Sequence, residues 1–207
     1  MSRSSALSIV RAAVGVGVLA TIAVQMSSNM GAGTFNPTRF FAFFTIESNL
    51  YGAILFLFLA ARRSASGSVG LDLARGASVV YLTVTFFVVI FLLSGADLQV
   101  AIPWVDAVLH KIFPVIVVLD WLVDPPAHRL TFRQALTWLI FPLAWVAFTL
   151  IRGAVEGWYP YPFLNPTNGG YGSVPVTSAA ILIGFLIIAA VVVALGNFAR
   201  TWSSKPA

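Results

Sequence analysis

Six long apolar runs, joined by short loops, limit what this chain can fold into. The runs extend from Ala12 to Gln25, Phe40 to Leu59, Ala77 to Ser94, Val105 to Val123, Ala135 to Ile151 and Val176 to Asn197. A helix needs about 20 mostly apolar residues to cross the hydrocarbon core of a bilayer. Because backbone polar groups in lipid must bond within their own segment, each run is expected to form a transmembrane helix.

The composition supports a membrane protein with a single domain. Of the 207 residues, 59% are hydrophobic and only 9% are charged, unlike an ordinary soluble domain. The six runs leave no room for a separate soluble unit, so residues 1–207 are predicted to form one all-α bundle of six transmembrane helices. We expect a multi-pass protein of the cell membrane, in a bacterium the inner membrane.

The basic residues predict the orientation of the bundle, because Lys and Arg in short loops are retained on the cytoplasmic side. Under a six-pass topology, one side receives Arg3, Arg11, Arg62, Arg63, Arg75, Arg129, Arg133, Arg200 and Lys205. Only Arg39 and Arg152 flank the other side. Both termini are therefore predicted to be cytoplasmic.

Several classes of chemistry are disfavoured by composition. The chain has no cysteine and two histidines, which argues against disulfides, thiolate nucleophiles and a metal site. We expect no cofactor. The formal charge of +5 is not gathered into a dense basic patch, so membrane orientation explains it better than nucleic-acid binding.

The second run contains a cluster of polar residues. Helical spacing places Thr45, Ser48 and Asn49 on one face, with Glu47 about half a turn away. Ser48 and Asn49 either donate to a developing oxyanion or serve helix packing. Glu47 is either an acid-base partner or an ion-pair partner of Lys111, since an isolated charge in a membrane is costly.

The fourth run carries a histidine between a carboxylate and a proline. Asp106, His110 and Pro114 follow one another at i, i+4 spacing, with Lys111 beside them. Asp106 either orients the His110 imidazole or is a solvated acid at the start of the helix. Thr45 and His110 each lie about five residues past the start of their runs, or roughly 8 Å deep. The equal depth makes a Thr45–His110 pair geometrically possible.

Such a pair has a recognised chemistry. A threonine hydroxyl becomes an effective nucleophile when a neighbouring base takes its proton, and a carboxylate holds the histidine in the required tautomer. The competing interpretation is structural, because hydroxyls in membrane helices commonly bond to the i−4 carbonyl or hold helices together.

Other polar residues have simpler interpretations. Arg152 and Glu156 are spaced to pair with each other, although Arg152 with Arg39 could instead bind an anionic headgroup or carboxylate. Asp120, Trp121 and Asp124 are interpreted as an interface anchor, and His128 as part of a noncatalytic polar turn; all four belong to the cytoplasmic end.

The last outer loop and the last run complete the survey. Aromatic residues between Trp158 and Tyr171 form either a belt at the headgroup level, the favoured interpretation, or a lid over the bundle. The run from Val176 to Leu195 has no charged residue and is expected to serve packing or face lipid.

Three short motifs carry a resemblance to a known family: FFTIESN at 43–49, LHKIFP at 109–114 and YPYPFL at 159–164. Together they resemble the androgen-induced membrane hydrolase family and its bacterial six-pass relatives, over most of the chain. The resemblance implies hydrolysis of fatty acid esters of hydroxy fatty acids by a membrane-embedded threonine and a histidine. Those roles fall on Thr45 and His110, with an acyl-threonine intermediate and an outer-facing cavity that supplies water.

The resulting hypothesis is an intramembrane esterase acting on a lipid or fatty-acyl ester. Its catalytic residues are Thr45 and His110, with further substrate-binding or supporting residues Glu47, Ser48, Asn49, Asp106, Lys111 and Arg152. The first rival is a small proton-linked transporter in which Glu47, His110 and Lys111 relay charge. The second is a noncatalytic lipid-binding scaffold in which the polar cluster only specifies packing.

Overall fold

The computed structural model describes residues 3–62, 67–93 and 102–203, and every regular element within them is helical. Within these residues, five segments are long and apolar enough to cross a membrane: Ser5–Gly31, Phe44–Ala61, Val69–Phe91, Phe132–Glu156 and Ser173–Trp202. The predictions of an all-α fold and of a multi-pass membrane protein are confirmed. Ser94, Arg63 and Lys205, used in predicting the third run and the orientation, lie outside the described residues.

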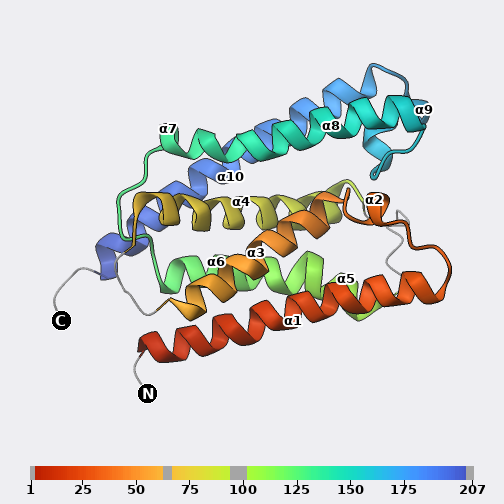
Figure 1. Cartoon of the computed structure of the whole chain (residues 1–207). Helices are drawn as coiled ribbons and strands as arrows, with labels where there is room; N and C mark the ends of the chain where they lie inside the picture. The colour runs from red at the N-terminus through yellow and green to blue at the C-terminus, as the bar shows by residue number, and fades with distance from the viewer. Residues whose placement is uncertain (1–2, 63–66, 94–101, 204–207) are drawn as a thin grey trace.

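The helices form an elongated bundle (Figure 1). They are, in chain order, α1 (Arg3–Gly31), α2 (Pro37–Phe40), α3 (Phe44–Ala61), α4 (Val69–Phe91), α5 (Pro103–Ala107), η1 (Val108–Ile112), α6 (Phe113–Val123), α7 (Phe132–Ala135), η2 (Leu136–Leu139), α8 (Ile140–Glu156), η3 (Pro162–Leu164), α9 (Pro166–Gly169) and α10 (Ser173–Ser203). Figure 1 shows that α1 begins and α10 ends at one end of the bundle, whereas α2 and α9 lie at the other.

The second apolar run does not form one helix. Asn36 caps the short α2 by accepting a hydrogen bond from the Arg39 backbone N–H, and Pro37 is well suited to its first turn. The backbone then becomes extended at Phe43, so α3 begins at Phe44. Thr45 is therefore the second residue of its helix, and the prediction that it lies five residues inside is wrong.

The fourth apolar run is helical from Pro103 to Val123 but changes geometry in the middle. The turn η1 is a π-helix, in which the Phe113 N–H bonds to the Val108 carbonyl five residues earlier. In this register the Leu109 carbonyl would need the N–H of residue 114, which proline lacks. Asn49 supplies the missing donor from α3, with its Nδ2 3.1 Å from the Leu109 oxygen.

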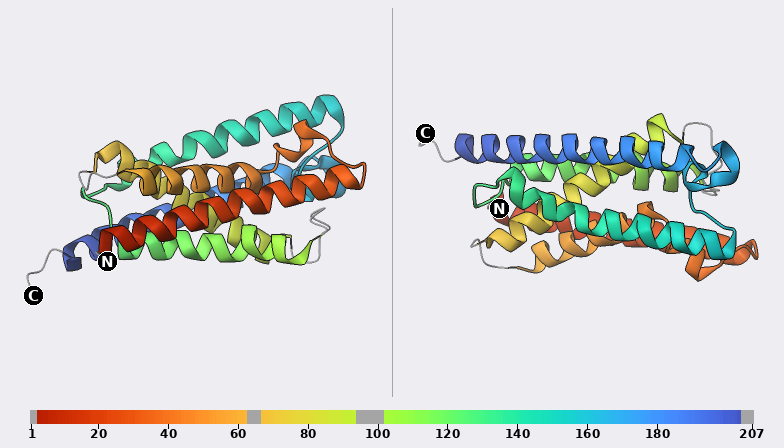
Figure 2. Two further views of the ribbon diagram at one scale, coloured as in Figure 1. Left: turned by 60° about the horizontal axis from the view of Figure 1, so that its bottom comes forward. Right: turned by 90° about the horizontal axis from the view of Figure 1, so that it is seen from above.

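Helices α3 and α4 form the centre of the bundle. Helix α1 packs along α3, while α6 and α10 pack along α4, an arrangement that can be followed in Figure 2. Helix α8 contacts α3 through aromatic side chains: the Phe44 ring lies 5.6 Å from that of Phe141 and 5.3 Å from that of Trp145. Side chains of α4, α8 and α10 enclose a cavity, described below.

Charged residues near the ends of α1, α4 and α6 form a buried network. Arg11 Nε lies 2.7 Å from an Asp120 oxygen, and Arg75 Nη2 lies 3.3 Å from the other. Both arginines also contact the Asp124 carboxylate. The Asp120 side chain is only 10% exposed, and Trp121 is buried with its indole N–H bonded to the Val192 carbonyl. The interface-anchor prediction is wrong for Asp120 and Trp121, because both groups find partners inside the bundle.

Candidate active site

Thr45 occupies the first turn of α3, where backbone N–H groups have no partner within the helix. Its N–H donates to the hydroxyl oxygen of Tyr161, at 3.3 Å. The Thr45 hydroxyl lies 3.3 Å from the same Tyr161 oxygen, and the residue is 6% exposed. The break between α2 and α3 thus provides the backbone donor that connects Thr45 to Tyr161.

His110 lies on the other side of Thr45, in the π turn. Its Nε2 is 3.3 Å from Thr45 Oγ1, and its Nδ1 is 2.7 Å from an Asp106 carboxylate oxygen. A carboxylate only accepts, so Nδ1 carries the proton and the Nε2 lone pair faces the Thr45 hydroxyl. The structure therefore brings together Thr45, His110 and Asp106, in the order expected of a nucleophile, a base and an orienting acid.

The hydrogen bonds around Thr45 form one consistent chain. Tyr161 accepts from the Thr45 N–H and can donate its own proton to Thr45 Oγ1. The Thr45 hydroxyl can then donate to His110 Nε2, and His110 Nδ1–H to Asp106. Each hydrogen bond in this series has its own proton and its own acceptor. The Thr45 hydroxyl proton is thereby directed at His110 Nε2.

Asn49 joins the two helices that carry Thr45 and His110. Its Nδ2 donates to the Thr45 carbonyl at 2.8 Å and to the Leu109 carbonyl at 3.1 Å, and the residue is fully buried. Ser48 is also buried, and its hydroxyl lies 3.2 Å from the Thr45 carbonyl and 3.4 Å from Thr85 Oγ1. Both side chains are thus bonded to the helix framework, which favours packing over oxyanion binding.

The remaining predicted site residues lie at the edge of this cluster or outside it. Lys111 Nζ is 3.6 Å from Asp106, so the proposed Glu47–Lys111 pair is not formed. Glu47 has one buried carboxylate oxygen that finds no hydrogen-bond partner in the part of the chain that the structure describes. Arg152 pairs with Glu156 at 2.9 Å, as the favoured interpretation predicted, and donates to the Thr38 carbonyl at 2.7 Å.

His128 lies in a different part of the molecule. Its backbone N–H and its Nδ1 contact one Asp72 carboxylate oxygen, at 2.9 and 2.8 Å. Asp72 is 1% exposed and also accepts from the Ala127 N–H, so the contact ties the turn before α7 to α4. The structure does not bring His128 to Thr45.

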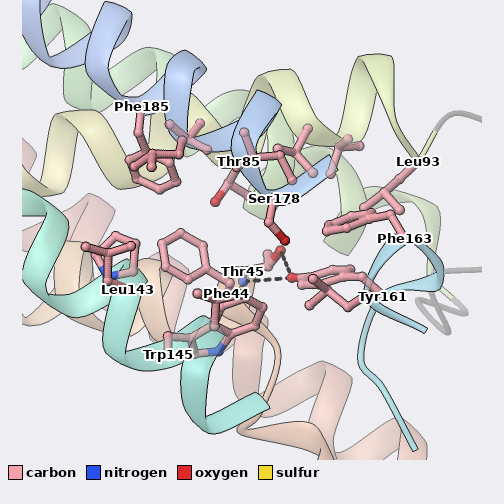
Figure 3. Close-up of a pocket in the computed structure, with 18 of the residues that line it drawn as sticks. Phe44, Thr45, Thr85, Leu93, Leu143, Trp145, Tyr161, Phe163, Ser178 and Phe185 are labelled. Carbon is pink, nitrogen blue, oxygen red and sulfur yellow. Dashed lines mark hydrogen bonds between the residues drawn. The ribbon is translucent and has the colours of Figure 1, made fainter. Parts of the chain in front are cut away.

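A largely apolar cavity opens beside Thr45 (Figure 3). The cavity and the open space at its mouth together amount to about 740 Å³. Its walls are formed by Phe44, Thr45, Val84, Thr85, Val88, Val89, Leu93, Leu139, Pro142, Leu143, Trp145, Val146, Tyr161, Phe163, Leu164, Ser178, Ile181, Leu182 and Phe185. The hydroxyls of the lining threonine, tyrosine and serine residues are its main polar groups, and such a cavity is suited to an alkyl or acyl chain.

Tyr161 is the site residue that the sequence interpretation missed. It is 6% exposed, its ring stacks on Phe163 at 5.3 Å, and it meets Phe43 edge-on at 5.7 Å. Burial raises the pKa of the Tyr161 phenol, so the hydroxyl stays protonated near neutral pH.

The part of the loop around Tyr161 folds back into the bundle, contrary to the favoured aromatic-belt interpretation, whereas Tyr171 is 87% exposed. The sequence signal that could have identified Tyr161 as a site residue is the YPYPFL motif at 159–164.

Helix α10 was also underestimated. Ser178, Ile181, Leu182 and Phe185 follow one another at helical spacing and all line the cavity. One face of α10, which has no charged residue between Val176 and Leu195, therefore belongs to the candidate site rather than to packing or lipid contact alone.

Comparison with known proteins adds no assignment, since no family model, curated protein or solved structure matches the chain.

Proposed function

We propose that this chain is an intramembrane hydrolase that cleaves carboxylic esters of lipids, with Thr45 as nucleophile and His110 as general base. One observation carries the proposal: the hydrogen-bonded series Asp106–His110–Thr45 ends at the wall of an apolar cavity. An activated hydroxyl beside a space for an acyl chain supports acyl transfer.

The proposed reaction has two steps. His110 Nε2 takes the Thr45 hydroxyl proton while Thr45 Oγ1 forms a bond to the ester carbonyl carbon. The ester C–O bond then breaks, and His110 returns the proton to the departing alcohol. In the second step His110 activates water, which releases the fatty acid and restores the Thr45 hydroxyl. Asp106 stabilises the imidazolium that forms in each step.

The site also contains a candidate donor for the negative charge that develops on the carbonyl oxygen. The Tyr161 hydroxyl lies 3.3 Å from Thr45 Oγ1 and lines the cavity, so a carbonyl attacked by Thr45 would be within its reach. Such donors stabilise the tetrahedral intermediate because they are already oriented before charge develops.

The proposed substrates are fatty acid esters of hydroxy fatty acids or similar acyl esters. The apolar lining of the cavity fits a fatty-acyl chain, and the motifs containing Thr45, His110 and Tyr161 resemble those of the androgen-induced membrane hydrolase family. No cofactor is needed for the steps described.

We further propose six membrane crossings with both termini cytoplasmic. The helical segment from Pro103 to Val123 is long enough, at about 1.5 Å per residue, to add a sixth crossing to the five long helices. An even number of crossings agrees with α1 beginning and α10 ending at one end (Figure 1). The basic residues favour that end as the cytoplasmic one.

The packing favours a hydrolase over a charge relay. The polar groups at Thr45 and the charge network at Asp120 are separated by an apolar layer. In that layer Phe113 lies 5.5 Å from the Phe56 ring, and a Cβ on Gly52 would come within 2.9 Å of Phe113. A proton-linked transporter would need a polar connection through this layer. A noncatalytic lipid-binding scaffold would use the cavity, but it would not need a base and an orienting carboxylate aligned on the Thr45 hydroxyl.

The proposal is tested by treating the purified protein with a long-chain fluorophosphonate and measuring its intact mass. We expect one adduct, mapped by peptide analysis to Thr45, in the parent protein and in Thr45→Ser. Thr45→Ala and His110→Ala should give none. Thr85→Ala is the matched control, since Thr85 lines the same cavity but donates to the Tyr81 carbonyl; it should retain the adduct.

Hydrolysis of a fatty acid ester of a hydroxy fatty acid is then followed in the same proteins. Turnover should disappear with the adduct in Thr45→Ala and His110→Ala. Full esterase activity in folded Thr45→Ala protein would eliminate Thr45 as the nucleophile. If the parent shows neither adduct nor turnover, a pH-dependent flux in proteoliposomes that His110→Ala abolishes would identify the transporter instead.

A further inference from the structure

A second polar group faces the cavity from the wall opposite α3. Ser178 belongs to α10 and lines the cavity together with Thr45, and in Figure 3 its hydroxyl points into the cavity on the side of Thr45 and Tyr161. Its side-chain oxygen is buried and has no hydrogen-bond partner among the described residues. A serine in a membrane helix ordinarily donates to the i−4 carbonyl, so this hydroxyl is unusual.

The other hydroxyls that line the cavity already have partners. Thr85 donates to the Tyr81 carbonyl at 3.0 Å. Thr45 and Tyr161 bond to each other, as described above. Ser178 alone among these lining hydroxyls retains an unused donor in the described structure. A buried donor without a partner is destabilising, and its occurrence on a cavity wall points to a ligand that accepts the bond.

The position of Ser178 along α10 indicates which part of a ligand it would meet. Ser178 lies near the start of α10, and the lining residues that follow it, Ile181, Leu182 and Phe185, are apolar. Thr45 likewise lies at the start of α3. The cavity is therefore polar near the beginnings of these helices and apolar further along α10. An acyl ester matches this division, with its carbonyl group at the polar part and its hydrocarbon chain beyond.

We propose that Ser178 is a substrate-binding residue that donates a hydrogen bond to the carbonyl oxygen of the acyl group, holding that group opposite Thr45. This inference rests on the proposed hydrolase function and extends it to α10. An ester carbonyl has acceptors and no donor, so it can take the unused Ser178 proton. This hydrogen bond would place the carbonyl carbon, rather than another carbon of the acyl chain, beside the Thr45 hydroxyl.

The test compares two ligands of equal length, a long-chain ketone and the corresponding alkane, in the Thr45→Ala protein. The ketone presents the carbonyl without an ester bond, and removing the Thr45 hydroxyl prevents its covalent addition. Binding is measured by displacement of a fluorescent fatty acid in detergent micelles. Ser178→Ala should weaken ketone binding about five- to tenfold, the effect of one hydrogen bond, and leave alkane binding unchanged.

Two matched variants separate binding from packing. Ser178→Thr retains a hydroxyl and should retain ketone preference, while Thr177→Ala removes a hydroxyl that does not line the cavity and should change neither affinity. Equal loss for ketone and alkane in Ser178→Ala, or no loss for either, would overturn the proposal. Ketone binding needs no nucleophile, so this result is independent of whether the fluorophosphonate labels Thr45.

Discussion

At the scale of single residues, Tyr161 has two hydrogen-bonding tasks at one oxygen. It accepts the Thr45 N–H, which fixes its position, and it lies 3.3 Å from the Thr45 hydroxyl oxygen. Because burial keeps the phenol protonated, the same oxygen retains a proton that it can donate. In the proposed reaction this proton turns from Thr45 Oγ1 to the oxyanion.

Replacement of Tyr161 by phenylalanine tests that role. Tyr161→Phe keeps the ring contacts but removes the hydroxyl, so we expect ester turnover to fall about 100- to 1000-fold, the range found for loss of one oxyanion donor. Tyr159→Phe is the control, because the Tyr159 ring packs against Gly153 and does not line the cavity. Turnover is measured with purified protein in micelles, and near-parental turnover in Tyr161→Phe would contradict the assignment.

The pH dependence of ester turnover provides a second test of Tyr161. The pKa of the Tyr161 phenol is raised by burial above its ordinary value near 10. The phenol therefore keeps its proton at every pH below about 10 and loses it only above the raised pKa. Turnover in the parent should not decline between about pH 7 and 9 through loss of this proton.

At the scale of elements, the π turn depends on the pairing of Pro114 with Asn49. Proline removes the N–H that the Leu109 carbonyl would use, and Asn49 replaces it from α3. The same amide group holds the Thr45 carbonyl. The local irregularity in one helix thereby becomes a connection between the helices that carry the proposed nucleophile and base.

A double-mutant cycle tests this connection. Asn49→Leu should lower the free energy of unfolding by about 1–3 kcal/mol, because two buried carbonyls lose their shared donor. In the Pro114→Ala background residue 114 has an N–H for the Leu109 carbonyl, so the same change should cost about 1 kcal/mol less. Unfolding is followed in mixed micelles with increasing SDS. Strictly additive effects would show that Asn49 does not replace the missing N–H.

The sequence predicted these elements better than their ends or their contacts. The shared face of Thr45, Ser48 and Asn49 followed from helical periodicity, and all three are buried together. The break before Phe44 was missed because an aromatic run without polar residues hides the end of α2. The contact of Tyr161 with Thr45 joins residues 116 positions apart through an irregular loop, and no periodicity encodes such a contact.

At the scale of the whole molecule, the two polar clusters have different tasks. The chain from Asp106 to Thr45 ends at a cavity, whereas the network of Arg11, Arg75, Asp120 and Asp124 joins three helices. Two basic and two acidic groups balance each other in this network. Arg11 and Asp120 lie 109 positions apart in the chain, so their contact connects α1 to α6.

Removal of one charge from this network should destabilise the protein without altering the chemistry at Thr45. In Asp120→Asn, Arg11 and Arg75 would share only Asp124, whose side chain is 42% exposed, while both arginines stay buried. Loss of one partner from a buried ion pair costs about 3 kcal/mol or more, far above the effect of an exposed charge. We therefore expect a loss of about that size on unfolding in SDS, against less than about 1 kcal/mol for Arg133→Gln.

The separation of the two polar clusters predicts that Asp120→Asn lowers stability but leaves the reactivity of Thr45 unchanged. Because the apolar layer at Phe56 and Phe113 separates Asp120 from His110, Asp120→Asn protein that remains folded should react with fluorophosphonate at the parental rate. The labelling rate is normalised to the folded fraction measured by far-ultraviolet circular dichroism. A small change in stability would show that the network contributes little to holding the three helices together. A slower reaction at full folding would show instead that the network is coupled to the site, which is the behaviour expected of a charge relay across the bundle.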